Sequence, residues 1–159
     1  MRVIAALCLL VFGSLPAFAQ QAPSSSTLKN IATSSDVAAI AARLKSQPPQ
    51  PLRAAPMLRL SPYTANVEYR TAVANAAIHE TEAELFYVID GAATLVTGGE
   101  LVDAQRTNPQ NQSGKSIKGG TSQRVSKGDF MIVPEGTPHW FSAVDGSITM
   151  MSLHLPRQK

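Results

Sequence analysis

The chain has 159 residues, of which 44% are hydrophobic and 16% are charged, and its formal net charge is +3. This composition excludes a disordered, highly charged chain, and the length favours one domain with a single core. The basic residues are scattered along the sequence, so no Lys and Arg cluster predicts nucleic-acid binding. The single cysteine excludes an internal disulfide framework and a cysteine-based zinc site.

Residues 1–19 predict a signal peptide. Arg2 precedes an apolar run from Val3 to Leu15, and Ala17-Phe18-Ala19 has the small-x-small pattern of a cleavage site before Gln20. A membrane anchor is the alternative, but a span needs about 20 apolar residues and this run is shorter. We therefore expect an exported protein, periplasmic or secreted, that has no membrane contact after cleavage.

Residues 20–62 predict an N-terminal arm. Ser35 and Asp36 are typical of a helix start, and apolar residues follow at helical spacing, namely Val37, Ile40, Ala41 and Leu44. Five prolines between Pro48 and Pro62 predict a stiff, extended connector after the helix. We expect the helix to pack on the outside of the main domain, and a partner-binding helix is the alternative.

Residues 63–159 predict an all-β domain. Alternation of apolar and polar residues begins near Ala65, and short apolar runs predict strands at 85–89, 93–96, 129–133, 139–144 and 148–155. Short strands separated by Gly and Pro favour a sandwich or barrel. The polar segment between Gly99 and Gly120 is long for a hairpin loop, which predicts a functional or mobile loop.

The first of two segments with ligand-type residues begins at His79. If His79 ends one strand and Glu84 begins the next, the four residues between them form a hairpin loop. The two side chains would then face each other across the ladder with Cβ atoms about 4.5–5.5 Å apart. That separation suits two ligands of one metal ion. A simple ion pair within the hairpin is the alternative, and Glu80 and Glu82 are expected to be solvated loop charges.

The second segment runs from Gly128 to His139. A turn at Gly128 leads into a strand, Pro134 ends that strand, and Gly136 permits a tight turn. His139 then opens the next strand with its imidazole directed at the interior. A buried histidine bonded to a backbone carbonyl is the alternative for His139.

Together the segments resemble the two motifs of the cupin superfamily. The matching positions are His79, Glu84 and Gly91 for H-x4-E-x6-G, and Gly128, Pro134, Gly136 and His139 for G-x5-P-x-G-x2-H. The resemblance covers residues 67–156. It implies a double-stranded β-helix, which is a small jelly roll, with an internal cavity and often a homodimer.

Three departures from the family pattern are visible. The first motif usually opens with an earlier histidine, where this chain has Ala77, and the second often ends with an asparagine, where it has Ala143. The spacing between Gly91 and Gly128 is also long. Its extra residues are the polar segment, which is expected to lie over the barrel mouth.

The resemblance implies that His79, Glu84 and His139 hold one divalent transition metal ion, which could be Fe, Mn, Ni, Cu or Zn. Two histidines and one carboxylate resemble the facial arrangement of non-haem iron sites, which leaves coordination positions open. The missing ligand at Ala77 keeps weak or absent metal binding as an alternative.

Four further residues are predicted to contact a small-molecule ligand. Alternate residues of a strand share one face, so Phe86 lies on the same face as Glu84 and Phe141 on the same face as His139. These two rings are therefore expected to line the cavity. Tyr69 is a predicted cavity wall. His154 could line the interior and compensate for Ala77. Core packing is the alternative for the aromatic residues, and a surface or core position is the alternative for His154.

Three function hypotheses follow. The first is a metal-dependent enzyme of the dioxygenase, isomerase or lyase type that acts on a small oxygenated molecule. The second is a non-catalytic protein that binds a sugar-like molecule with weak metal binding or none. The third is an interaction module in which the arm and the polar loop bind a partner. A fold by itself does not choose among them.

Overall fold

The computed structural model describes residues 30–157. The predicted signal peptide, residues 1–19, and the first part of the predicted arm lie outside the described residues. Within residues 30–157 the elements are helix α1 (Ser34–Ser46) and strands β1 (Leu52–Leu60), β2 (Tyr63–Arg70), β3 (Ala76–His79), β4 (Glu82–Thr97), β5 (Glu100–Val102), β6 (Gln105–Asn108), β7 (Asn111–Gly114), β8 (Ser116–Lys118), β9 (Thr121–Ser126), β10 (Phe130–Val133) and β11 (His139–Pro156). Within residues 30–157, no helix has the length and apolar character that a membrane crossing requires.

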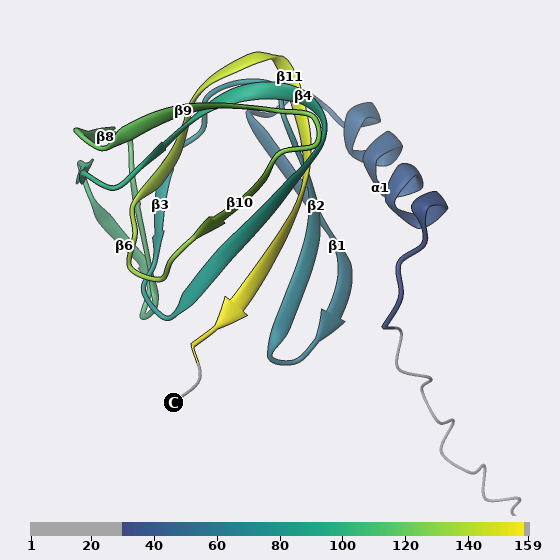
Figure 1. The fold of residues 1–159 in the computed structure, drawn as a ribbon, viewed down its shortest axis with the longest axis horizontal. Helices are drawn as coiled ribbons and strands as arrows, with labels where there is room; N and C mark the ends of the chain where they lie inside the picture. Colours follow the sequence, from purple (N-terminus) through teal and green to yellow (C-terminus); the bar gives the residue numbers. More distant parts are fainter. Residues whose placement is uncertain (1–29, 158–159) are drawn as a thin grey trace, which may run out of the picture.

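The strands curl into a barrel, which confirms the predicted all-β jelly roll (Figure 1). One path through the larger sheet runs β1-β2-β11-β3-β7-β6. Strand β4 pairs with β9, β10 and β11, so it forms the facing wall. Strand β11 belongs to both walls because it pairs with β2 and β3 as well as with β4.

Strands β4 and β11 are long and bent, whereas the sequence predicted two short strands in place of each. Asp90-Gly91 bends β4 without ending it, because Gly91 takes a φ of +84° that side chains rarely adopt. A Cβ at Gly91 would lie 2.0 Å from the carbonyl oxygen of Ser147, so the two strands approach closely at this bend. Register shifts along β11 let it follow the same curve.

Helix α1 packs on the outside of the barrel against β1 and β2 (Figure 1). It begins with a capping box in which Thr33 and Asp36 each bond the backbone of the other, as the predicted helix start suggests. Leu44 is fully buried against Ala55 and Val67. The helix therefore covers one part of the outer sheet face.

The proline-rich stretch differs from the predicted connector, because it contains strand β1. The segment is extended, as expected, but it pairs antiparallel with β2. An edge strand tolerates proline, since one side of its backbone needs no ladder partner. Pro56 also lies where the register of this pair shifts.

The segment between Gly99 and Gly120 also differs from the predicted loop, because it forms the short strands β5 to β8. Strand β7 adds to the edge of β3, and β6 adds to β7. Strands β5 and β8 pair with each other. The segment is largely polar and half-buried or exposed, so it lacks the apolar alternation by which strands are recognised in sequence.

Candidate metal centre

His79 ends β3, as predicted, and the second motif holds it in place. The backbone N–H of Gly136 donates to the carbonyl oxygen of His79 at 2.7 Å. Ala77, two residues earlier on β3, lies directly opposite His139 on β11. The two motif segments are therefore neighbours in space.

Glu84 lies near the start of β4 and does not face His79 across a hairpin ladder, so that part of the prediction is wrong. Strand β3 pairs with β7 and β11, whereas β4 pairs with β9, β10 and β11. The ladder neighbours of Glu84 are Val133 on β10 and His154 on β11. His79 and Glu84 approach each other because the chain passes from one wall of the barrel to the other between them.

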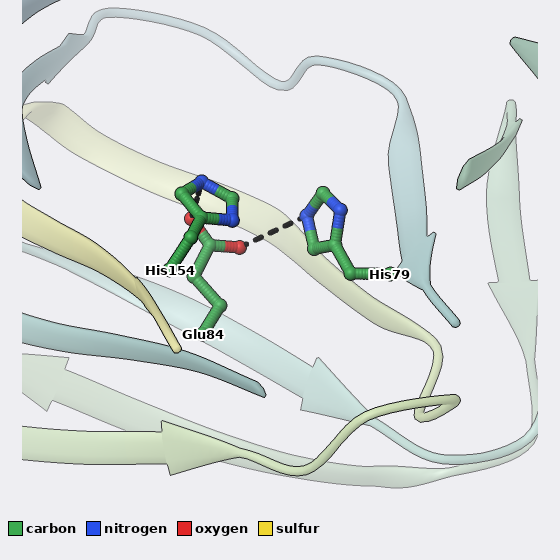
Figure 2. A group of neighbouring side chains, drawn as sticks. All are labelled: His79, Glu84 and His154. Atoms are coloured by element: carbon green, nitrogen blue, oxygen red, sulfur yellow. Dashed lines mark ion pairs between the residues drawn. The ribbon is translucent and has the colours of Figure 1, made fainter. Parts of the chain in front are cut away.

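Three imidazoles converge on the Glu84 carboxylate. Its Oε2 lies 3.1 Å from Nε2 of His79 and 3.2 Å from Nε2 of His139. Its Oε1 lies 3.4 Å from Nε2 of His154. Figure 2 shows His79 and His154 reaching the carboxylate from different strands. We call His79, Glu84, His139 and His154 the histidine–glutamate cluster.

The outer nitrogen of each imidazole faces an oxygen atom. Nδ1 of His79 lies 2.9 Å from Oδ1 of Asn111, and Nδ1 of His139 lies 3.2 Å from the carbonyl oxygen of Thr137. Nδ1 of His154 lies 2.8 Å from Oε1 of Glu82, although this contact is not aligned as a hydrogen bond. Histidine ligands of metal ions are commonly oriented in this way, with Nδ1 towards an oxygen and Nε2 towards the metal.

The cluster carries opposing electrostatic effects. Burial acts to raise the pKa of Glu84, but hydrogen bonds from His139 and His79 and charge at His139 and His154 hold that pKa well below its usual range. Burial acts to lower the pKa of His79, but its contacts with Glu84 and Asn111 raise that pKa above its ordinary value. The carboxylate is therefore ionised and attracts positive charge, either as protons on the rings or as a cation.

The donor set fits a divalent transition metal. Ligand atoms of His79, Glu84 and His154 all lie within 4.8 Å of one another, so this group could hold a metal ion. His139 is outside that group but contacts the same carboxylate. Imidazole nitrogen with one carboxylate suits Zn, Cu, Fe, Ni and Mn. The side chains of His79 and His154 are 17% and 19% exposed, so solvent reaches the cluster at these two rings.

Tyr69 does not belong to this site, which corrects its prediction as a cavity wall. Its ring packs outside the barrel with the apolar side chains that α1 buries against β1 and β2. The guanidinium carbon of Arg53 lies 4.9 Å from the centroid of this ring. On β2, the alternate residues Glu68 and Arg70 are buried as an ion pair, and the Arg70 guanidinium lies over the ring of Phe141. The parity of β2 therefore turns Tyr69 away from the interior.

Phe86 and Phe141 are inside the barrel, but they belong to its apolar core. Their exposed fractions are 0% and 2%, which leaves almost no surface for a substrate. The two rings meet edge to face with centroids 5.6 Å apart, and Phe86 also lies edge-on to His139. The pair packs against the cluster through the contact of Phe86 with His139, in keeping with the packing alternative for these two residues.

Two acidic residues have partners that the sequence did not suggest. Glu80 is bonded by both outer nitrogens of Arg106 and by the side-chain amide of Gln112, and these bonds lower its pKa. Glu82 contacts His154.

Asn111 was not predicted as a site residue. Its only sequence signal is its place in an unusually long polar segment.

A jelly-roll barrel that carries a histidine–glutamate cluster defines a cupin-type protein. A family model described as "Cupin" matches residues 49–154. The chain belongs to the cupin family, which confirms the predicted resemblance.

Several solved structures are similar to this chain. The protein TT1209 from Thermus thermophilus has a TM-score of 0.52 and 14% identity, with coverage of 74% of this chain and 95% of its own. KdgF from Halomonas sp. has a TM-score of 0.49, 19% identity and coverage of 69% and 82%. A Streptomyces PAC13 variant with uridine has a TM-score of 0.49, 11% identity and coverage of 69% and 72%. At 14% identity, the likeness to TT1209 shows a shared fold alone. No curated protein matches the sequence.

Proposed function

We propose that this cupin binds one divalent transition metal ion at the histidine–glutamate cluster and acts as a metal-dependent enzyme on a small oxygen-bearing molecule. One observation carries the proposal: the Nε2 atoms of His79, His139 and His154 all face the Glu84 carboxylate, while their Nδ1 atoms face other oxygens. If each neutral imidazole carries its hydrogen on Nδ1, towards those other oxygens, the three Nε2 lone pairs face the carboxylate. A cation between them removes that repulsion.

The proposed ligand set is larger than the one predicted from the motifs. His79, Glu84 and His139 are the predicted ligands, and the position of His154 opposite Glu84 adds a third imidazole. His154 would supply the ligand that the family pattern places at Ala77. A bound metal would provide a Lewis acid or redox centre for the dioxygenase, isomerase or lyase chemistry considered above.

The first experiment is metal analysis of the purified protein beside Glu84→Ala and His139→Ala. We expect close to one equivalent of metal in the native protein and a loss in both variants, with circular dichroism showing that they remain folded. Glu100→Ala is a matched control, because that residue is an exposed glutamate on β5, in the separate β5–β8 sheet. Absence of metal from the native protein after reconstitution would contradict the proposal.

A second candidate is binding of a sugar-like molecule without metal. An open pocket of about 540 Å³ lies along β6 and β7, and amide and hydroxyl side chains form part of its lining, including Asn75, Gln105, Thr107 and Ser113. Such groups match a molecule rich in hydroxyls. Isothermal titration with small sugars in the presence of a chelator separates this candidate from the first, because only metal-free binding would survive chelation.

Export and homodimer formation complete the proposal. Cleavage before Gln20 is tested by the mass of the exported protein. Support for a dimer comes from an apolar groove of about 430 Å³ that residues of β1, β2, β4, β10 and β11 line, including the exposed side chain of Phe130. Light scattering of the purified protein tests the dimer, and a monomer mass at all concentrations would contradict it.

A further inference from the structure

The β6–β7 hairpin contributes a side chain to the metal centre. Asn111 is the first residue of β7 and lies directly opposite His79 in the β3–β7 ladder. Its Oδ1 is 2.9 Å from Nδ1 of His79. The second oxygen near that nitrogen, Oε1 of Glu82, is 3.9 Å away, which is beyond hydrogen-bonding distance. Asn111 is therefore the hydrogen-bonding partner of Nδ1 of His79.

With the amide oxygen towards the ring, this contact favours Nε2 as the acceptor nitrogen that His79 presents to the cluster. The amide oxygen of asparagine accepts hydrogen bonds and cannot donate one. When Nδ1 carries the hydrogen and donates it to Asn111, the Nε2 atom of a neutral ring has a free lone pair. In the opposite tautomer, Nε2–H would point at the Glu84 carboxylate and no metal could bind there.

The hairpin that carries Asn111 is itself fixed against the end of β3. The Glu80 carboxylate accepts hydrogen bonds from Arg106 on β6 at 2.9 and 3.0 Å and from Gln112 on β7 at 2.6 Å. The backbone N–H of Glu80 donates to the carbonyl oxygen of Gln110 at 2.8 Å. These contacts lie on both sides of Asn111, so the backbone that carries its side chain is held against the end of β3.

We propose that Asn111 is a positioning residue of the metal centre, which holds His79 as the Nδ1–H tautomer and so presents its Nε2 lone pair to the metal. The consequence for metal binding rests on the proposed function. The β6–β7 hairpin, which lies between the two family motifs in the sequence, then contributes to metal binding through Asn111. Outer partners of metal-ligating histidines typically change metal affinity by about 10–100-fold when they are removed.

The test compares Asn111→Leu, which removes the acceptor at similar size, with Asn111→Asp, which keeps an oxygen in the same place. Gln110→Ala is the matched control, because Gln110 precedes Asn111 and carries the same amide group on an exposed side chain. Its contact with Glu80 is through the backbone carbonyl, which the substitution keeps. Zinc affinity is measured by competition with a chromophoric chelator. We expect a loss of about 10–100-fold for Asn111→Leu, recovery to near the native value for Asn111→Asp, and no change for Gln110→Ala.

A second measurement does not need metal. The carboxylate of Glu84 lies 3.1 Å from Nε2 and would accept its hydrogen in the absence of metal, so the spectra are recorded on chelated protein in a Glu84→Ala background. Long-range 1H–15N spectra at a pH where the ring is neutral report which nitrogen of His79 carries hydrogen. In this background we expect Nδ1–H with Asn111 and with Asn111→Asp, and a shift towards Nε2–H with Asn111→Leu. Asn111→Ala serves the same purpose if Asn111→Leu does not fold.

The outcomes separate this inference from the proposed function. In the Glu84→Ala background, Nε2–H with Asn111 present, or an unchanged tautomer in Asn111→Leu, overturns the role of Asn111 whatever the metal result. Unchanged zinc affinity in Asn111→Leu also overturns it. If the native protein binds no metal but the tautomer in the Glu84→Ala background depends on Asn111, the positioning role is supported and the proposed function is removed.

Discussion

Ala77 and His154 together decide how many imidazoles the cluster has. Ala77 lies two residues before His79, on the same face of β3, and directly opposite His139. A histidine there would enter the cluster from β3, as in the family pattern. In this chain the additional imidazole comes from β11, where His154 is the ladder neighbour of Glu84.

This arrangement predicts that His154→Ala weakens metal binding and that Ala77→His restores part of it in the same chain. Opposed residues of a ladder have Cβ atoms about 4.5–5.5 Å apart, so an imidazole at position 77 can reach the cluster beside His139. Metal affinity by chelator competition measures both effects. Leu155→Ala, next to His154 on the opposite face of the strand, is the control. An unchanged affinity in His154→Ala would show that this ring is not a ligand.

The cluster also predicts the pH dependence of stability in the metal-free protein. The pKa of His79 is raised above 6.5, so its contribution is complete below pH 6.5 and is lost as the pH rises through the raised value. The pKa of Glu84 is lowered from 4.5, so its contribution is present above pH 4.5 and is lost as the pH falls towards the lowered value. The free energy of unfolding should therefore be greatest in mildly acidic solution.

Denaturant unfolding of the chelated protein across this pH range measures the effect. Glu84→Gln should flatten both sides of the profile, because it removes the carboxylate that attracts the protons. Metal affinity should instead increase as the pH rises, since metal and proton compete for the same ring nitrogen of His79. A native profile without a decline above pH 6.5 would contradict the raised pKa of His79.

At the scale of elements, the sequence predicts where strands begin better than which strands pair. The ends marked by turn residues are correct: His79 ends β3, and His139 opens β11 after the Gly136 turn. The pairing of His79 with Glu84 across a hairpin is wrong, because no local signal shows that the chain changes walls between them. His154 and Asn111 have no motif, since each reaches the cluster only through the register of its strand.

The bend in β4 gives a prediction for a single element. Gly91→Ala introduces a Cβ at a φ of +84° and 2.0 Å from the carbonyl oxygen of Ser147. Backbone strain and the contact together should lower the free energy of unfolding by about 3 kcal/mol or more. Gly146→Ala is the control, because its φ is +71° with no atom within 4 Å of the added Cβ. It should cost only the strain, about 1–2 kcal/mol. Equal losses in denaturant unfolding would show that β4 and β11 do not approach closely at Gly91.

For the whole molecule, the question is whether the arm stabilises the barrel or is held ready for a partner. The buried Leu44 favours the first answer, because its side chain is 1% exposed between α1 and the outer face of β1 and β2. Arg53 on β1 also donates hydrogen bonds to the carbonyl oxygens of Leu44 and Gln47 at the end of the helix. The helix is thus tied to the sheet by packing and by its C-terminal backbone groups.

Leu44→Ala should therefore lower the free energy of unfolding of the whole protein by about 2–5 kcal/mol, as large-to-small changes in a core do. Arg43→Ala, on the exposed side of the same helix, should change it by less than about 0.5 kcal/mol. Metal affinity should be unchanged in both variants, because the cluster lies inside the barrel and α1 lies outside it. Unfolding is followed by tryptophan fluorescence, since Trp140 donates its ring N–H to Ala74 within the barrel wall. A native-like free energy for Leu44→Ala would mean that α1 leaves the sheet readily, and the partner-binding interpretation of the arm would then be favoured.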